Sequence, residues 1–229
     1  MAARGNQHYT PQERRRTYGE HAPGNLARRG RWDRWVDVAD DATARYAAVT
    51  RAASVIVQYT AARLPPGYRT AAYRAAITDP GLCPDPDEAT EPPAWLAHVP
   101  RNPEQRRTLL LDDTVLYRPV GGPATMAEQC GHLLHLMEGT TGAGPVDIRV
   151  LPHDGPPGAF QLAGGEVGMV TVYDKQMIIG MHITPWYETR SGYARALTES
   201  LLQAVAETAD RQHSYDLISQ AADRWRRAA

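Results

Sequence analysis

The sequence predicts an α+β protein, and three observations support that prediction. Apolar side chains recur at helical spacing in residues 32–63 and 125–137. Residues 146–182 instead contain short β-branched and alternating runs. Beyond residue 184 the helical spacing returns. Helices, then a small antiparallel sheet with a hairpin, then helices packed on it is an order typical of the α+β class.

The chain is long enough for one well-buried core, with 229 residues of which 42% are hydrophobic. We expect a single α+β domain over residues 32–229, preceded by an arm over residues 1–31. Residues 1–35 contain eight arginines against three acidic residues and are interrupted by proline and glycine. Because this arm has no apolar periodicity, we expect it to be disordered.

Charge and cysteine content exclude several classes of protein. The net charge is −1, which argues against a globally basic nucleic-acid-binding protein. No apolar run reaches 18 residues, so we expect no membrane span, and the arginine-rich start lacks the apolar core of a secretion signal. Two cysteines without a CxxC motif favour a reducing, cytoplasmic location.

The first part of the domain is expected to be helical. Trp35 and Tyr46 belong to a pattern that predicts one helix over residues 32–63, ended by Pro65-Pro66-Gly67. A second helix is expected over 70–78, with Thr70 as its N-cap. Residues 79–105 hold seven prolines and predict an irregular, exposed loop.

The central part contains a short strand and a further helix. The run 109–111 predicts a strand, and Asp112-Asp113 can cap a helical turn that continues to Tyr117. Thr125 and Glu128 have the spacing of a capping box, which predicts a helix from there to about residue 137.

The next segments predict strands and then two helices. Strands are expected over 146–151 and 159–162, followed by a hairpin of 167–173 and 176–182 around an Asp174-Lys175 turn. Thr184-Pro185 has the form of a helix start, and the helical pattern runs from there to residue 206. A last helix is expected over 215–227.

Motifs for cofactors and metals are weak in this sequence. The glycine-rich run 164–168 precedes a strand rather than a helix, so it does not fit a nucleotide-binding loop, and there is no GxSxG motif. His132 and His135 can share a helix face, but a metal site needs further ligands nearby. Cys130 lies beside an apolar stripe and is expected to be buried and inert. We therefore expect neither a cofactor nor a metal.

The hairpin is the most informative candidate for a site. One of its faces is apolar, whereas the other mixes Thr171, Tyr173, Gln176 and His182 with apolar side chains. A mixed face suits either a small-molecule pocket or contact with solvent. If the protein is an enzyme, the acid–base candidates are Tyr173, Asp174, His182 and His153. The ligand-binding candidates are Tyr68, Arg69, Thr171, Gln176, Trp186 and Tyr187. We expect them to converge on one cavity, to which Arg69 gives a positive rim.

The order of motifs from about Trp32 to Arg226 resembles a known family. The motifs are the helix containing Tyr46 and Tyr59, Leu64-Pro65, Thr70 with Tyr73, Arg106-Arg107, Asp112–Leu116, Val120–Gly122, Met126 with Glu128-Gln129, Val150–Pro152, Gly158 with Phe160, and Val172–Asp174. They resemble the domain of unknown function that follows the helix-turn-helix in XRE-type (xenobiotic response element) regulators of actinobacteria. Those regulators are often encoded beside a small partner protein, in an antitoxin-like arrangement.

Two departures from that family bear on function. Residues 1–31 are too short for the helix-turn-helix, so the resemblance implies no specific DNA binding. The segment Pro65–Thr70 also differs from the family's usual Pro-Gly-Leu-Leu-Gln-Thr. The resemblance therefore implies a free-standing relative of the effector domain that binds a small molecule, a partner protein, or both. The alternative is a cofactor-independent enzyme of specialised metabolism, such as a cyclase or transferase; a purely structural role is the third. The sequence leaves the oligomeric state open.

Overall fold

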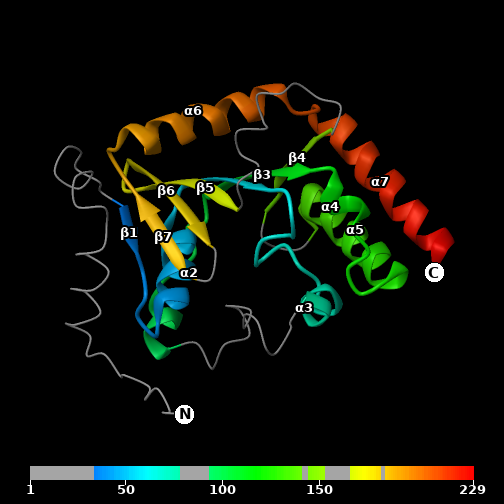
Figure 1. The fold of residues 1–229 in the computed structure, drawn as a ribbon. Helices are drawn as coiled ribbons and strands as arrows, with labels where there is room; N and C mark the ends of the chain where they lie inside the picture. The colour runs from blue at the N-terminus through cyan, green and yellow to red at the C-terminus, as the bar shows by residue number, and fades with distance from the viewer. Residues whose placement is uncertain (1–33, 78–92, 141–143, 153–165, 182–183) are drawn as a thin grey trace, which may run out of the picture. The chain divides into compact units, whose positions relative to one another are not determined.

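The computed structural model describes residues 34–77, 93–140, 144–152, 166–181 and 184–229. These residues belong to one compact unit, Arg34–Ala229 (Figure 1). The expected arm over 1–31, the strand over 159–162, and the motif residues Gly158 and Phe160 lie outside the described residues. Among the helices described, none is both long and apolar enough to cross a membrane.

The described residues form a seven-stranded mixed sheet, which confirms the α+β class. The strands are β1 (Arg34–Val36), β2 (Val55–Thr60), β3 (Arg106–Asp112), β4 (Asp147–Leu151), β5 (Val167–Val172), β6 (Lys175–Met181) and β7 (Pro185–Glu188). Their order is β1-β7-β6-β5-β2-β3-β4. The β2–β3 and β3–β4 pairs are parallel and the others antiparallel, so the sheet is larger than the small antiparallel one expected.

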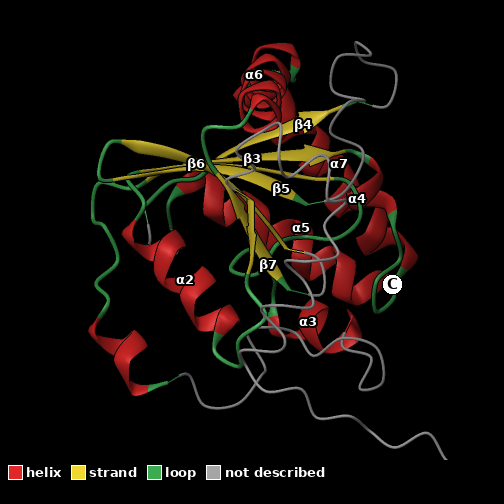
Figure 2. Ribbon diagram, turned by 60° about the vertical axis from the view of Figure 1, so that its left-hand side comes forward, coloured by secondary structure: helices red, strands yellow, loops and turns green. Residues whose placement is uncertain are grey.

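Helices cover both faces of this sheet. They are α2 (Ala42–Ala52), α3 (Ala71–Ile77), the 3₁₀ helix η1 (Ala94–His98), α4 (Thr114–Tyr117), α5 (Pro123–Glu138), α6 (Gly192–Glu207) and α7 (Arg211–Ala228). Figure 2 shows α6 on one side of the sheet and α2 and α5 on the other. Leu201 of α6 packs with Leu110 of β3, whereas Leu133 of α5 packs with Leu109 and Leu111. Residues that alternate along one strand therefore enter two different cores.

The helix expected over 32–63 is wrong as a single element. The structure divides it into β1, α2 and β2, and only the alanine-rich middle part is helical. The segment Val55–Thr60 is buried in the sheet between β3 and β5. A strand covered on both faces is apolar at successive positions, as Ile56 and Val57 are here, and such a run also fits a helical template.

The helix expected from Thr184-Pro185 begins later than predicted. Pro185–Glu188 is strand β7, which pairs with β1 and β6. A proline fits the first residue of a strand as well as the first turn of a helix, and the aromatic residues that follow favour a strand. Helix α6 begins only at Gly192, where Ser191 Oγ accepts a hydrogen bond from the Ala194 amide at 2.8 Å.

Helix starts elsewhere give one correction and one confirmation. Thr125 does not cap α5, because Pro123 begins that helix and Gly122, with φ of 86°, is the N-cap. The Thr125 hydroxyl donates instead to the Gly121 carbonyl at 3.1 Å. Thr70 does cap α3, since its Oγ1 accepts from the Tyr73 amide at 3.2 Å.

The hairpin turn lies one residue earlier than expected. Val172 pairs with Lys175, so the turn residues are Tyr173 and Asp174, with φ of 48° and 61°. Positive φ at both positions is the geometry of a type I′ turn, whose twist matches that of antiparallel strands. The shift keeps Thr171 and Gln176 on one face but removes Tyr173 from the strand.

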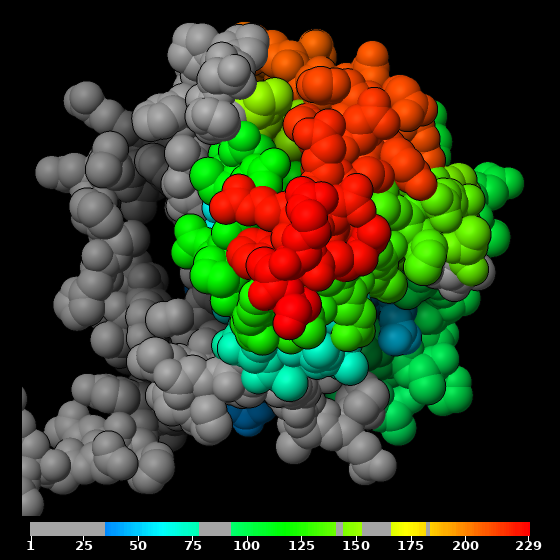
Figure 3. Space-filling view, turned by 90° about the vertical axis from the view of Figure 1, so that its right-hand side faces the viewer, coloured from blue at the N-terminus to red at the C-terminus, as the bar shows by residue number. Residues whose placement is uncertain are grey.

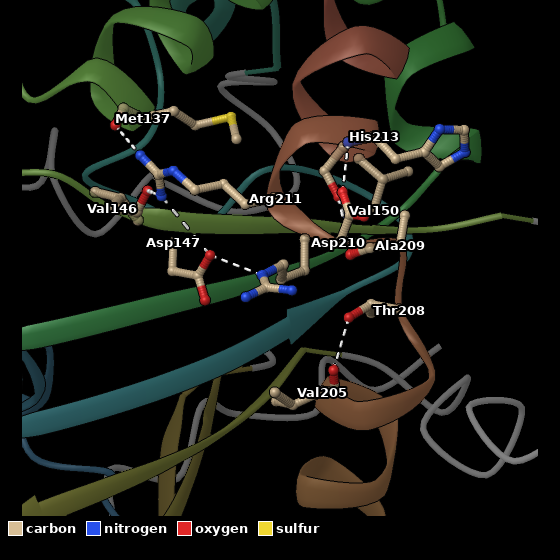
Figure 4. A network of polar contacts seen from close by, with 12 residues as sticks. Met137, Val146, Asp147, Val150, Val205, Thr208, Ala209, Asp210, Arg211 and His213 are labelled. Carbon is tan, nitrogen blue, oxygen red and sulfur yellow. Dashed lines mark hydrogen bonds and ion pairs between the residues drawn. The ribbon is translucent and has the colours of Figure 1, made fainter.

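The junction of α6 and α7 is fastened to the edge strand β4 (Figure 4). Arg211 donates hydrogen bonds to the carbonyls of Val146, at 3.1 Å, and Met137. It also lies 3.7 Å from Asp147. The next turn is capped, because Asp210 accepts from the His213 amide at 2.7 Å. These contacts join α5, β4 and α7, and Figure 3 shows α7 at the surface of this side.

Candidate functional site

A cavity of about 370 Å³ lies on the sheet face that α2 and α5 cover. Its floor comes from three strands, with Gln58 of β2, Arg107 of β3 and Met181 of β6. One wall is α2 and the opposite wall is α5, which contributes His132. The full lining is Thr43, Tyr46, Ala47, Thr50, Arg51, Ile56, Gln58, Pro66, Gly67, Tyr68, Arg101, Gln105, Arg107, His132, Leu136 and Met181. The cavity therefore has an apolar body with a few polar groups, as small-molecule sites do.

Two buried phenols provide hydrogen-bonding groups in this cavity. Burial raises the pKa of Tyr46 well above its usual value; negative Glu166 adds to this, and a hydrogen bond with Gln58 opposes it. Burial also raises the pKa of Tyr68 to about 12; Arg107 opposes this shift, and Glu166 adds to it. Both phenols therefore stay protonated at neutral pH and can donate a hydrogen bond to a ligand.

Among the described residues that line the cavity, the charged side chains are all cationic. Arg107 is half-buried on the floor, Arg101 is exposed at the rim, and Arg51 donates to the Leu96 carbonyl at 2.9 Å. Gln105 has a structural role, because its amide donates to the carbonyls of Thr50, at 2.6 Å, and Ala53, at 2.8 Å. Guanidinium and phenol donors together suit a ligand that carries a carboxylate or a phosphate.

The loop that carries Tyr68 into the cavity is fixed by a buried glutamine of α5. Gln129 accepts from the Thr70 amide at 2.7 Å and donates to the Tyr68 carbonyl at 2.8 Å. At the start of the loop, the Leu64 amide donates to the Tyr73 hydroxyl at 3.3 Å. The loop is thus tied at both ends, and Tyr68 is held in place by α5.

The imidazole of His132 is the titratable group on the α5 wall. Burial lowers its pKa from the usual 6.5; the neighbouring charge of His135 lowers it further, and Glu128 opposes both. The neutral ring therefore prevails at neutral pH, and it can accept a proton or a hydrogen bond.

Because of His132, the free energy of unfolding should depend on pH in the mildly acidic range. Because its pKa is lowered on folding, the unfolded chain takes up the proton first as pH falls below 6.5. The contribution of the neutral His132 ring to the free energy of unfolding is fully present above pH 6.5, and it is lost as the pH falls towards the folded-state pKa of His132. We expect the free energy of unfolding of His132→Gln, from urea titrations between about pH 7 and 5, to fall less than that of the wild type. His213→Gln, on an exposed part of α7, is the control, and equal pH profiles for all three proteins would contradict the expectation.

Most residues predicted as a site from the sequence do not converge. Tyr173 is 89% exposed in the hairpin turn, beside exposed Asp174. Gln176 is exposed and Thr171 half-buried on the sheet face that α6 covers. His153 and His182 lie outside the described residues.

The two residues of the aromatic pair Trp186-Tyr187 lie in different places, and so do the two residues Tyr68-Arg69. Trp186 packs in the core under α6, whereas Tyr187 packs with Tyr46 on the other side of the sheet. Tyr68 lines the cavity, as a ligand-binding residue should. Arg69 does not form its rim, because it is 7% exposed and donates to the Leu64 carbonyl at 2.7 Å. The expectation of one common cavity is therefore wrong.

The expectation for Cys130 agrees with the structure. The thiol is free and buried, and burial raises its pKa to about 12, so it is a poor nucleophile. Within the described ranges, no three histidine, cysteine or acidic side chains gather closely enough to hold a metal ion.

Sequence reasoning missed the residues on the floor of the cavity. Gln58 interrupts the apolar run of β2, and Arg107 lies two residues before the leucine run of β3. A polar side chain inside a buried strand is informative, because it needs a partner there. A helical interpretation of the β2 segment hides this signal.

These features define an α+β domain with a basic cavity between two helices. The chain belongs to the DUF5753 family, described as a domain of unknown function, whose family model matches residues 43–220. All residues that line the cavity lie within that range. Neither a curated protein nor a solved structure is significantly similar to the chain.

Proposed function

We propose that the protein is a binding protein for a small anionic molecule, held in the cavity between α2 and α5. The observation that supports this most is the donor-rich lining, in which Arg107, Arg101 and the protonated Tyr68 surround an apolar space. An aromatic or aliphatic carboxylate matches both the apolar walls and the guanidinium groups.

The biological setting that we propose follows the family resemblance. The chain would be a cytoplasmic, actinobacterial relative of the effector domain of XRE-type regulators. Its ligand would control contact with a small partner protein. Several residues of the shared motifs support this, because Tyr46 and Arg107 line the cavity, and Thr70 and Gln129 hold its loop.

The test uses two neighbouring arginines of β3 that point to opposite faces of the sheet. Naphthoate and inorganic phosphate are the probes, and naphthamide is the neutral analogue of the first. We expect the wild type to bind naphthoate more tightly than naphthamide by calorimetry. We expect Arg107→Gln to weaken naphthoate binding about tenfold, because a charge-assisted hydrogen bond is lost.

Arg106→Gln is the matched control, since Arg106 is exposed and does not line the cavity. We expect its affinity to equal that of the wild type. Equal losses in both variants would show a general effect of charge and contradict the proposal. The absence of binding for both naphthoate and phosphate at millimolar concentration would also contradict it.

The second candidate function is the cofactor-independent enzyme, a cyclase or transferase. It is favoured by the neutral imidazole of His132 in the same cavity, because such a group can act as a general base. The His132→Gln variant distinguishes the two functions for any ligand that binds. If the protein is an enzyme, the variant should still bind the ligand but no longer convert it. If it is a binding protein, neither the wild type nor the variant should convert the ligand.

A further inference from the structure

The basic cavity has two chemically different ends, and the first of them is cationic. Arg101 and Arg107 both line the cavity. Gln105, which lies between them in the chain, donates to the Thr50 carbonyl in the last turn of α2 at 2.6 Å. The cationic end therefore lies where α2 ends and β3 begins.

Gln58 is the polar residue at the other end of the cavity. It is 6% exposed on the interior strand β2, and its register partners are Leu109 of β3 and Gly168 of β5. A Cβ atom on Gly168 would lie 3.1 Å from Gln58 Cγ, so the glycine leaves room for the glutamine side chain. A hydrogen bond joins Gln58 to the hydroxyl of Tyr46 on α2. An amide has two N–H donors and a carbonyl acceptor, so one phenol uses only part of its capacity.

The charges that act on the two phenols distinguish the ends of the cavity. Burial is the largest cause of the raised pKa of both Tyr46 and Tyr68. The strongest charge effect on the pKa of Tyr68 comes from positive Arg107, whereas that on the pKa of Tyr46 comes from negative Glu166. A ligand carboxylate is therefore favoured at the arginine end, and an uncharged polar group at the end formed by Gln58 and Tyr46.

The floor and one wall of the cavity give similar separations between these ends. Arg107 is the register partner of Ile56, and Gln58 follows Ile56 by two residues, which is about 6.7 Å along a strand. Tyr46 and Thr50 lie four residues apart on α2, which is about 6 Å along a helix. A ligand that reaches both ends needs two polar groups roughly 6–8 Å apart, as at opposite ends of an aromatic ring system.

We propose that the ligand of the basic cavity is an aromatic carboxylate with a hydroxyl group at the end of the ring system farthest from the carboxylate. The carboxylate lies against Arg107 and Arg101, and the hydroxyl exchanges hydrogen bonds with Gln58 and Tyr46. Gln58 then determines specificity, because a ligand without the hydroxyl leaves its amide incompletely paired. This inference rests on the anion-binding function proposed above.

The experiment compares 2-naphthoate with two hydroxylated forms of the same molecule. The hydroxyl of 6-hydroxy-2-naphthoate lies at the far end of the rings, and that of 3-hydroxy-2-naphthoate lies beside the carboxylate. Calorimetry with the full chain should show the 6-hydroxy compound binding about fivefold more tightly than 2-naphthoate, because one hydrogen bond is gained. The 3-hydroxy compound should bind no more tightly than 2-naphthoate.

The outcomes separate this inference from the function on which it rests. If 2-naphthoate binds and the 6-hydroxy compound binds no more tightly, the inference is overturned and the anion-binding function stands. Equal affinities of the two hydroxylated compounds would overturn it as well. If none of the three compounds binds at millimolar concentration, both proposals are contradicted.

Variants of β2 and α2 test the role of Gln58 through the ratio of the affinities for the 6-hydroxy compound and 2-naphthoate. Gln58→Met keeps the length of the side chain, and the ratio should fall from about five to about one, because the partner of the hydroxyl is absent. Tyr46→Phe deletes one oxygen from the same end, and it should at least halve the ratio even if Gln58→Met does not fold.

Tyr59→Phe is the matched control. Tyr59 is the next residue of β2, but it packs in the core under α6 and does not line the cavity. Its variant also loses a buried hydroxyl, and the ratio of affinities should equal that of the wild type. A wild-type ratio in folded Gln58→Met or Tyr46→Phe, or an equal loss in Tyr59→Phe, would overturn the assignment.

Discussion

Replacing Gly180 with alanine should destabilise the protein by about 3 kcal/mol, the sum of an overpacked core and a displaced aromatic ring. Gly180 lies in β6, directly opposite Trp186 of β7. A Cβ atom at position 180 would be 2.2 Å from Cε2 and 2.3 Å from Nε1 of that indole ring. Trp186 is buried in the core under α6, so the rigid ring has no free space into which it can move.

Chemical denaturation of two matched variants measures this effect. Gly131→Ala is the control, because an added Cβ there meets nothing within 4 Å. Since Gly131 lies inside helix α5, we expect that variant to gain about 0.5–1 kcal/mol of stability.

A double-mutant cycle identifies the cause of the loss. In the Trp186→Leu background the obstructing ring is absent, so Gly180→Ala should cost less than about 1 kcal/mol. The same cost in both backgrounds would show that the ring is not responsible.

The sequence predicts those helices and strands whose apolar pattern reflects packing on one side only. Helices α5, α6 and α7 were expected because each has one apolar side, and only their first residues were misplaced. The hairpin of β5 and β6 was expected from its alternation, with the turn displaced by one residue. Local signals therefore give the class of the fold and most of its helices.

The centre of the sheet could not be predicted in the same way. Strand β2 is covered by α2 on one face and α6 on the other, and this arrangement is a property of the whole domain. Its short apolar run is compatible with a buried helix or a buried strand, and only the partners β3 and β5 decide between them.

The basic cavity depends on that same arrangement. Gln58 and Arg107 come from separate parts of the chain and lie near each other only because β2 and β3 pair in parallel. Tyr68 belongs to a loop whose position depends on α5. Sequence reasoning selected Tyr68 for its departure from the family pattern, but it could not place the partners of Tyr68.

Because the position of Tyr68 depends on α5, replacing Gln129 should both destabilise the protein and release the loop that carries Tyr68 into the cavity. Gln129 is fully buried and connects α5 to the backbone on both sides of Arg69. Gln129→Met keeps the length of the side chain, so it creates no large void. It leaves the Thr70 amide and the Tyr68 carbonyl buried without their partner, and each unsatisfied group costs about 1–3 kcal/mol.

We therefore expect Gln129→Met to lower the free energy of unfolding by about 2–4 kcal/mol in urea titrations. Glu128→Gln, at the exposed neighbouring position of α5, should change it by less than about 0.5 kcal/mol. Hydrogen exchange gives a local measurement, because the Thr70 amide loses its acceptor and should exchange faster in Gln129→Met. Unchanged protection of that amide would mean that the loop is held by other contacts, and Tyr68 would then keep its place in the cavity without Gln129.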